Sequence, residues 1–104
     1  KKVAWSGEIQ FEFELVSQSA ELGQIRVEYA IDFVRQKGVT SRKVFKISEG
    51  VCSASAKFYR CRYSFKPITT RRYYPGLHRL TIIVNGQEMA ERQFHLLSET
   101  DSSN

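Results

Sequence analysis

The sequence predicts an all-β fold, in which about seven strands form a sandwich of two sheets. Two observations indicate this fold: apolar residues alternate with polar ones along several segments, and turn residues separate those segments. No segment shows a sustained helical period of apolar residues. A chain of 104 residues has the size of one domain, so we expect residues 1–97 to form the sandwich and residues 98–104 to be a disordered polar tail.

Two long strands are predicted near the start of the chain, after a short strand near Trp5. Apolar residues occupy every second position from Ile9 to Leu15, and the same period returns from Ile25 to Phe33. The glutamates between the apolar residues of the first strand face solvent on this pattern. They therefore form an exposed face and not a pair of catalytic carboxylates.

The later strands are predicted from alternation and from turn residues. A shorter strand near Lys43–Ile47 is expected towards a sheet edge, because its charges discourage further pairing. The segment Lys57–Lys66 alternates again and carries Arg60 and Arg62 as part of a row of positive charge. Asn85-Gly86 stands between two alternating segments, which predicts a hairpin with a type I′ turn.

The segment Tyr74–Ile82 indicates the immunoglobulin-like version of a sandwich. It is typical of a corner turn entering the penultimate strand, where such folds often place a tyrosine that bonds back to the corner. His78 occupies that place here, so we interpret it as a structural corner residue and not as a catalytic residue or a ligand. The Cys…Trp…Cys spacing of antibody domains is absent, which leaves the wider immunoglobulin-like class.

The residues that usually carry chemistry are sparse. Cys52 and Cys61 are the only cysteines, which favours a cytoplasmic protein with two free thiols, a short-loop disulfide being the alternative. His78 and His95 are the only other nitrogen or sulfur candidates for a metal, and they lack paired metal spacing. A nucleophile elbow and the phosphate-binding glycine motifs are also absent. We expect no enzymatic activity, no cofactor and no metal in this domain, and no membrane partner.

Positive charge is concentrated in the middle of the sequence. The stretch from Arg35 to Arg79 holds twelve basic residues and one acid, whereas the rest of the chain holds four basic and ten acidic residues. Such a stretch favours a polyanionic partner, because each phosphate that is neutralised releases counterions. The alternative is an ordinary solvated surface, on which acids are usually interspersed.

The segment Lys66–Gly76 is the strongest candidate for a binding loop. Its hydroxyl, guanidinium and aromatic side chains suit phosphates, sugars and bases, and they belong to Thr69, Thr70, Arg71, Arg72, Tyr73 and Tyr74. The alternative is that the tyrosines close the end of the core and that the arginines pair with acids of the first strands.

Three segments resemble one protein family. They are TSRKVFKI at residues 40–47, SFKPITTRRYYPG at residues 64–76, and His78-Arg79 followed by Val84-Asn85-Gly86. Together they resemble the C-terminal immunoglobulin-like domain of bacterial AlkC-type DNA alkylation repair proteins, which are HEAT-like-repeat 3-methyladenine DNA glycosylases. The likeness covers roughly residues 20–97.

The resemblance implies a non-catalytic accessory domain that contacts the backbone and minor groove of duplex DNA. The excision chemistry of that family belongs to a helical-repeat domain, so an upstream HEAT-like helical domain of the same chain is an expected partner and the domain is expected to be a monomer. The matching motifs carry over Thr69, Thr70, Arg71, Arg72 and Tyr73 as contact or loop-shaping residues, with Lys43 and Lys46. Arg60 and Arg62, from the row of positive charge, are further candidate contacts with DNA. A protein-interaction module that docks an acidic partner, or the helical domain of its own parent, is the alternative.

Overall fold

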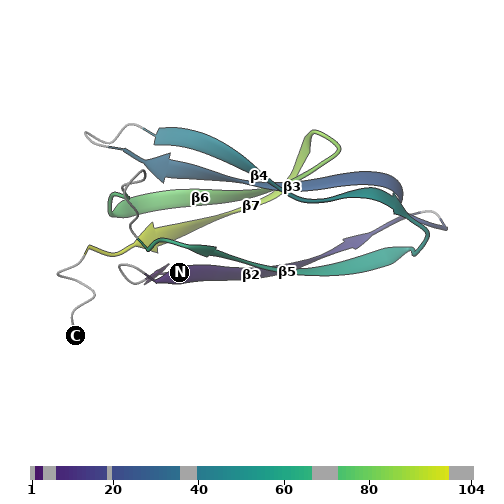
Figure 1. The fold of residues 1–104 in the computed structure, drawn as a ribbon, viewed down its shortest axis with the longest axis horizontal. Coiled ribbons are helices and arrows are strands. Elements are labelled where there is room, and N and C mark those ends of the chain that lie inside the picture. The colour runs from purple at the N-terminus through teal and green to yellow at the C-terminus, as the bar shows by residue number, and fades with distance from the viewer. Residues whose placement is uncertain (1, 4–6, 19, 36–39, 67–72, 99–104) are drawn as a thin grey trace.

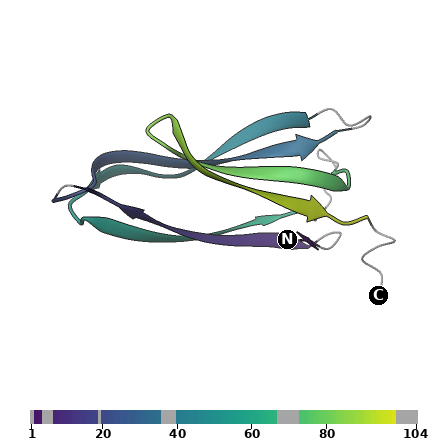
Figure 2. The same cartoon turned by 180° about the vertical axis from the view of Figure 1, so that it is seen from behind.

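Seven strands form two sheets in the computed structural model, which describes residues 2–3, 7–18, 20–35, 40–66 and 73–98. The strands are β1 (Lys2–Val3), β2 (Glu8–Val16), β3 (Gly23–Val34), β4 (Thr40–Cys52), β5 (Ala56–Ser64), β6 (Gly76–Val84) and β7 (Gln87–Leu96). Five of them pair in the order β1-β7-β6-β3-β4, whereas β2 and β5 form a sheet of their own. The two sheets lie face to face (Figure 1), and the view from behind shows the same layers (Figure 2). The predicted all-β sandwich is confirmed.

The core lies between the two sheets, at the positions where alternation places apolar residues. Along β3, every second side chain from Ile25 to Phe33 is buried, because successive side chains of a strand point to opposite faces. Ile9 of β2 and Tyr59 of β5 are the buried residues that the smaller sheet contributes from its strands. The glutamates of β2 are exposed at Glu8, Glu12 and Glu14, as the alternation predicts.

The core contains more large aromatic side chains at one end of the sandwich. At this end β3, β5 and β7 finish and β4 and β6 begin, on the left in Figure 1, and we call it the loop end. Its main cluster includes Phe33, Phe65, Tyr73, Phe94 and Leu96. The smaller cluster of the other end contains the buried residues Ile25, Val27 and Tyr59. The fold therefore holds its loop end with large aromatic side chains.

The predicted hairpin is confirmed in its turn and strands. Asn85 has a φ of 51° and Gly86 a φ of 80°, which are the two positive values that a type I′ turn requires. The Asn85 side chain also fastens the turn to β3, because its Oδ1 accepts a hydrogen bond from the Arg26 backbone N–H at 2.8 Å. The turn residue therefore links the hairpin to the neighbouring strand.

Two strand boundaries differ from the prediction. The strand predicted at Lys43–Ile47 extends over Thr40–Cys52, because all of β3 is available as its antiparallel partner, from Gly23 opposite Cys52 to Val34 opposite Thr40. Its position at a sheet edge is confirmed, and the edge explains why a strand with so many charges can form.

The second difference concerns the start of β6. This strand begins at Gly76, so His78 is not at a corner turn but is the third residue of the strand, opposite Phe94. The short strand predicted near Trp5 is found at Lys2–Val3, and Trp5 itself lies outside the described residues. Apart from Ser98, the expected tail also lies outside them.

Candidate nucleic-acid interface

Four of the predicted contact residues, Thr69, Thr70, Arg71 and Arg72, lie outside the described residues. The fifth, Tyr73, is only 6% exposed and belongs to the main core cluster. Its hydroxyl lies 2.7 Å from that of Tyr63, and its ring packs against Phe33 and Phe65. Of the two roles considered for this tyrosine, the structure supports the one in which it closes the core.

His78 is a structural residue, although it lies within a strand. Its side chain is 1% exposed and is surrounded by the rings of Phe33, Phe65 and Phe94. Nδ1 lies 3.1 Å from the Gly76 carbonyl oxygen, an acceptor, so Nδ1 carries the proton and donates it. Nε2 is buried and has no hydrogen-bond partner among the described residues. Burial lowers the pKa of His78, the Gly76 hydrogen bond opposes this, and the charges of His95 and Arg35 lower it further.

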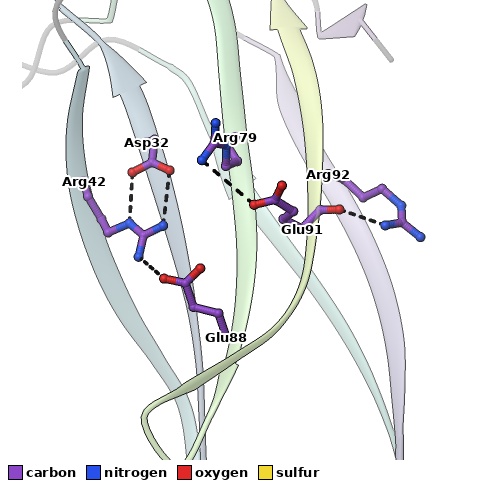
Figure 3. A network of polar contacts seen from close by, with 6 residues as sticks. All are labelled: Asp32, Arg42, Arg79, Glu88, Glu91 and Arg92. Atoms are coloured by element: carbon purple, nitrogen blue, oxygen red, sulfur yellow. Dashed lines mark hydrogen bonds and ion pairs between the residues drawn. The ribbon is translucent and has the colours of Figure 1, made fainter.

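Several cations of the basic stretch are paired with acids that are distant in the sequence. Arg42 of β4 donates from Nε to Asp32 Oδ1 and from Nη1 to Glu88 Oε2, each at 2.9 Å (Figure 3). These bonds raise the pKa of the Arg42 guanidinium, the hydrogen bond to Asp32 most of all. We call Asp32, Arg42 and Glu88 the ionic clasp, because they join strands β3, β4 and the start of β7 on the outer face of the larger sheet.

Ion pairs also form at three further cations, two of them with acids distant in the sequence and one with an acid three residues away. Arg60 donates to Glu12 at 2.6 Å across the β2–β5 pair. Lys46 lies 3.3 Å from Glu49, and Arg79 lies 3.9 Å from Glu91 on the neighbouring strand (Figure 3). The predicted contact residues Arg60 and Lys46 are therefore both neutralised by a neighbouring acid.

A second group of cations has no ion pair among the described residues. Lys43 and Phe45 share one face of β4, and Phe45 packs against Tyr63 of β5 with ring centroids 5.2 Å apart. Arg62 precedes Tyr63, and Lys66 follows two residues after the end of β5. All three are exposed and take part in no described ion pair.

Arg35 extends this group at the end of β3. Its guanidinium lies 5.7 Å from the centre of the Phe33 ring, and Phe33 in turn packs against Tyr63. We use the name cationic corner for Arg35, Lys43, Arg62 and Lys66, four cations without a described ion pair, of which Lys43 lies on the inner face of the larger sheet and Arg62 on the outer face of the smaller one. Glu8, opposite Ser64 beside this group, accepts a hydrogen bond from Gln10.

The basic stretch of the sequence does not form one face. Lys43 and Lys46 belong to the edge strand of the larger sheet, where Lys43 shares the inner face with Ile31 and Lys46 shares the outer face with Glu28. Arg60 and Arg62 point outward from the smaller sheet. Among the described residues the basic stretch is thus divided between the two sheets, because β4 and β5 follow each other in the chain but join different sheets. Arg35 was not among the predicted site residues, and Lys66 was named only as the start of the predicted binding segment; both become candidates because neither has a described ion pair and Arg35 lies over the Phe33 ring.

The remaining features offer no other reactive site in the described part of the chain. A hollow of about 360 Å³ on the outer face includes Asp32, Thr40, Arg42, Leu77 and Arg79, and thus belongs to the clasp region. Cys52 and Cys61 are free thiols, and burial raises the pKa of Cys61, which keeps it protonated. Within the described ranges, no three His, Cys, Asp or Glu side chains are grouped so that they could hold a metal ion. The described residues also contain no helix with the length and apolarity needed to cross a membrane.

The strand order and the two-sheet sandwich define an immunoglobulin-like domain. Over residues 1–98, the chain matches the family described as "Uncharacterised protein YhaZ, C-terminal Ig-like domain". The chain belongs to this family.

Two similar proteins are much longer than this chain. The protein YhaZ of Bacillus subtilis (strain 168) is 39% identical over 88 residues, which are 84% of this chain and 24% of YhaZ. The structure of the Pseudomonas fluorescens alkylpurine DNA glycosylase AlkC, bound to DNA containing an abasic site analog, matches with a TM-score of 0.85 and 30% identity. That match covers 93% of this chain and 27% of AlkC. The expected resemblance to AlkC-type proteins is confirmed, and the chain spans about a quarter of the length of these relatives.

Proposed function

We propose that this chain is a non-catalytic accessory domain of a DNA alkylation repair glycosylase and that it binds the backbone of duplex DNA through the cationic corner. The observation that carries the proposal is the division of the cations. Arg42, Lys46, Arg60 and Arg79 are paired with acids, whereas the described residues provide no ion pair for Arg35, Lys43, Arg62 or Lys66.

This difference matters because a cation that is paired with a carboxylate must give up that ion pair before it can bind a phosphate fully. An unpaired cation at the surface needs no such exchange, and it adds the release of counterions from DNA to the free energy of binding. Arg35 rests on packed aromatic side chains, because its guanidinium lies over the Phe33 ring and Tyr63 packs against both Phe33 and Phe45. Phosphate contacts of this kind position a protein on DNA without reading its sequence.

The similarity to AlkC supports DNA as the polyanion, because the matched AlkC structure contains DNA. The loop residues Thr69, Thr70, Arg71 and Arg72 remain part of the proposal on the strength of the sequence, as does contact with the minor groove. In this proposal the base-excision chemistry belongs to an upstream HEAT-like helical domain. Lys46 and Arg60 have secondary roles because of their acidic partners.

Two triple variants with the same loss of charge test the proposal. Lys43→Ala with Arg62→Ala and Lys66→Ala removes most of the corner, and the matched control is Lys46→Ala with Arg60→Ala and Arg79→Ala. Fluorescence anisotropy with a labelled duplex at low salt should show that the corner variant binds about tenfold or more weakly. Each phosphate contact that is lost should also reduce the slope of log affinity against log salt by about 0.9.

The control triple should weaken binding by less than about threefold, because its cations are already neutralised by acids. Equal losses in the two triples would show that only net charge matters and would contradict the proposed corner. No binding by the unmodified domain at low salt would contradict DNA binding altogether. If the helical domain of the parent protein, and not DNA, shifted the amide signals of the corner, the interaction module would be the better function.

The loop has a separate test. Arg71→Ala with Arg72→Ala should lower the affinity for duplex DNA and its salt dependence in the same assay, because two phosphate-binding cations are removed. An unchanged affinity would remove the loop from the site and leave the corner as the proposed contact.

A further inference from the structure

An apolar groove opens along the side of the sandwich opposite the β4 edge. It has a volume of about 150 Å³ and is lined by side chains from both sheets, namely Phe11, Glu12 and Phe13 from β2, Leu80 and Ile82 from β6, and Ala90, Glu91 and Arg92 from β7. Apolar residues form most of this lining. Such a groove at the junction of two sheets is suited to a further apolar segment.

One edge of β7 is unpaired along most of its length. β7 lies between β6 and β1, and β1 pairs only with His95 and Leu96. No other described strand pairs with the β1 side of β7, and residues 87–93 are exposed. An exposed edge of this length presents backbone N–H and C=O groups that can accept another strand.

The direction of β1 indicates where such a strand would come from. β1 runs parallel to β7, with Lys2 opposite His95 and Val3 opposite Leu96, and Leu97 donates its backbone N–H to the Val3 carbonyl oxygen at 2.8 Å. A chain that enters β1 along its own axis therefore arrives from the direction of the first residues of β7. There it would pass beside the groove.

We propose that, in a protein with the upstream domain of the proposed function, on which this inference rests, the linking segment continues β1 as a parallel strand along β7 and places alternate apolar side chains in the groove. The family is described as a C-terminal domain, and this chain covers 24% of YhaZ, so relatives have chain before this domain. Main-chain hydrogen bonds would provide the affinity, and the groove would select apolar side chains. The added strand would fix the orientation of the sandwich relative to the preceding domain. The inference does not rest on DNA binding.

Amide hydrogen exchange tests the proposal with two chains: residues 1–104, and the same chain extended at its N-terminus by about ten residues of its natural sequence, a length typical of strands. In the extended chain, amides of residues 88–93 that exchange rapidly in the shorter chain should slow by about tenfold or more. Ala90→Lys places a charge in the groove and should abolish this slowing in the extended chain. The matched control, Gln93→Lys, changes an exposed residue opposite Arg79 on the outer face and should retain it.

Three outcomes would overturn the proposal. Unchanged exchange at residues 88–93 would show that no strand is added. Slowing along the edge of β2 instead of β7 would place the added segment on the smaller sheet. Slowing in the shorter chain that increases with protein concentration would show that a second copy occupies the edge.

Discussion

The cationic corner and the ionic clasp contain the same kinds of side chain and differ in what supports them. In the clasp, Arg42 is held by Asp32 and Glu88, and its side chain remains 36% exposed. In the corner, Arg35 lies over the Phe33 ring, and the described residues give none of the four cations an ion pair. The comparison teaches that basic residues in one sequence stretch can be neutralised or left available according to the strand on which they fall.

The largest expected effect concerns the aromatic support of the corner. Tyr73→Ala should lower the free energy of unfolding by about 3–5 kcal/mol, because it removes a buried ring beside Phe33 and Phe65. Tyr73→Phe should cost only about 1 kcal/mol, the value of its hydroxyl contact with Tyr63. Urea denaturation measures both. If Tyr73→Phe instead weakened DNA binding without a change in stability, Tyr73 would be a contact residue and the comparison would fail.

The next effect is a pH dependence that originates in the same cluster. Because the pKa of His78 is lowered in the fold, the unfolded chain binds more protons once the pH falls below the ordinary histidine pKa of about 6.5. The free energy of unfolding should therefore decrease as the pH falls from 7 to 5. Protonation would place a second N–H at Nε2, where the described residues provide no acceptor. His78→Phe should reduce this pH dependence, as urea titrations at several pH values would show, and an unchanged dependence would assign it to other groups.

A smaller effect is expected on the face that carries the clasp. Thr81 lies on that face opposite Ala30, is 1% exposed, and its hydroxyl has no hydrogen-bond partner among the described residues. Thr81→Val should stabilise the domain by about 1 kcal/mol, because it replaces a buried unsatisfied hydroxyl with a methyl group of similar size. Thermal denaturation checks the sign. A loss of stability would mean that the hydroxyl has a partner after all.

The smallest effect is expected from the clasp itself. Arg42→Ala should cost about 0.5–1 kcal/mol, because an exposed ion pair gains little in water. It should also leave DNA affinity nearly unchanged when compared with Lys43→Ala, its neighbour on the same strand. Urea denaturation and anisotropy together measure the two properties. A large loss of affinity for Arg42→Ala alone would extend the DNA contact to the outer face.

Local patterns in the sequence were enough to predict much of the fold. Asn85-Gly86 specifies its own turn, and the alternation along β2 and β3 specifies which side chains are buried. The length of β4 was not predictable, because it depends on pairing with the whole of β3. The burial of Tyr73 remained undecided because a tyrosine in a loop can close a core or bind a ligand.

The composition of the candidate site was less predictable. Arg60 is neutralised by Glu12, which lies 48 residues away in the chain, and only the β2–β5 register brings the two together. Phe45 and Tyr63 are in ring contact, although they belong to different sheets. Charge counts along a sequence contain no information on such pairings, so they predict a polyanion but not the surface that meets it.

The isolation of β2 and β5 in their own sheet has a kinetic consequence. Glu8 of β2 pairs with Ser64 of β5, so a long stretch of chain must close before this sheet can form. In contrast, β6 and β7 are joined by a two-residue turn. Because closing long loops slows folding, we expect the β6–β7 hairpin to form before the folding barrier and the two-stranded sheet after it. Ile82→Val should then slow folding, and Ile9→Val should mainly accelerate unfolding, as stopped-flow measurements would show. The smaller sheet would be the last layer to form and the first to detach, which makes it the place where the aromatic core first becomes exposed to water.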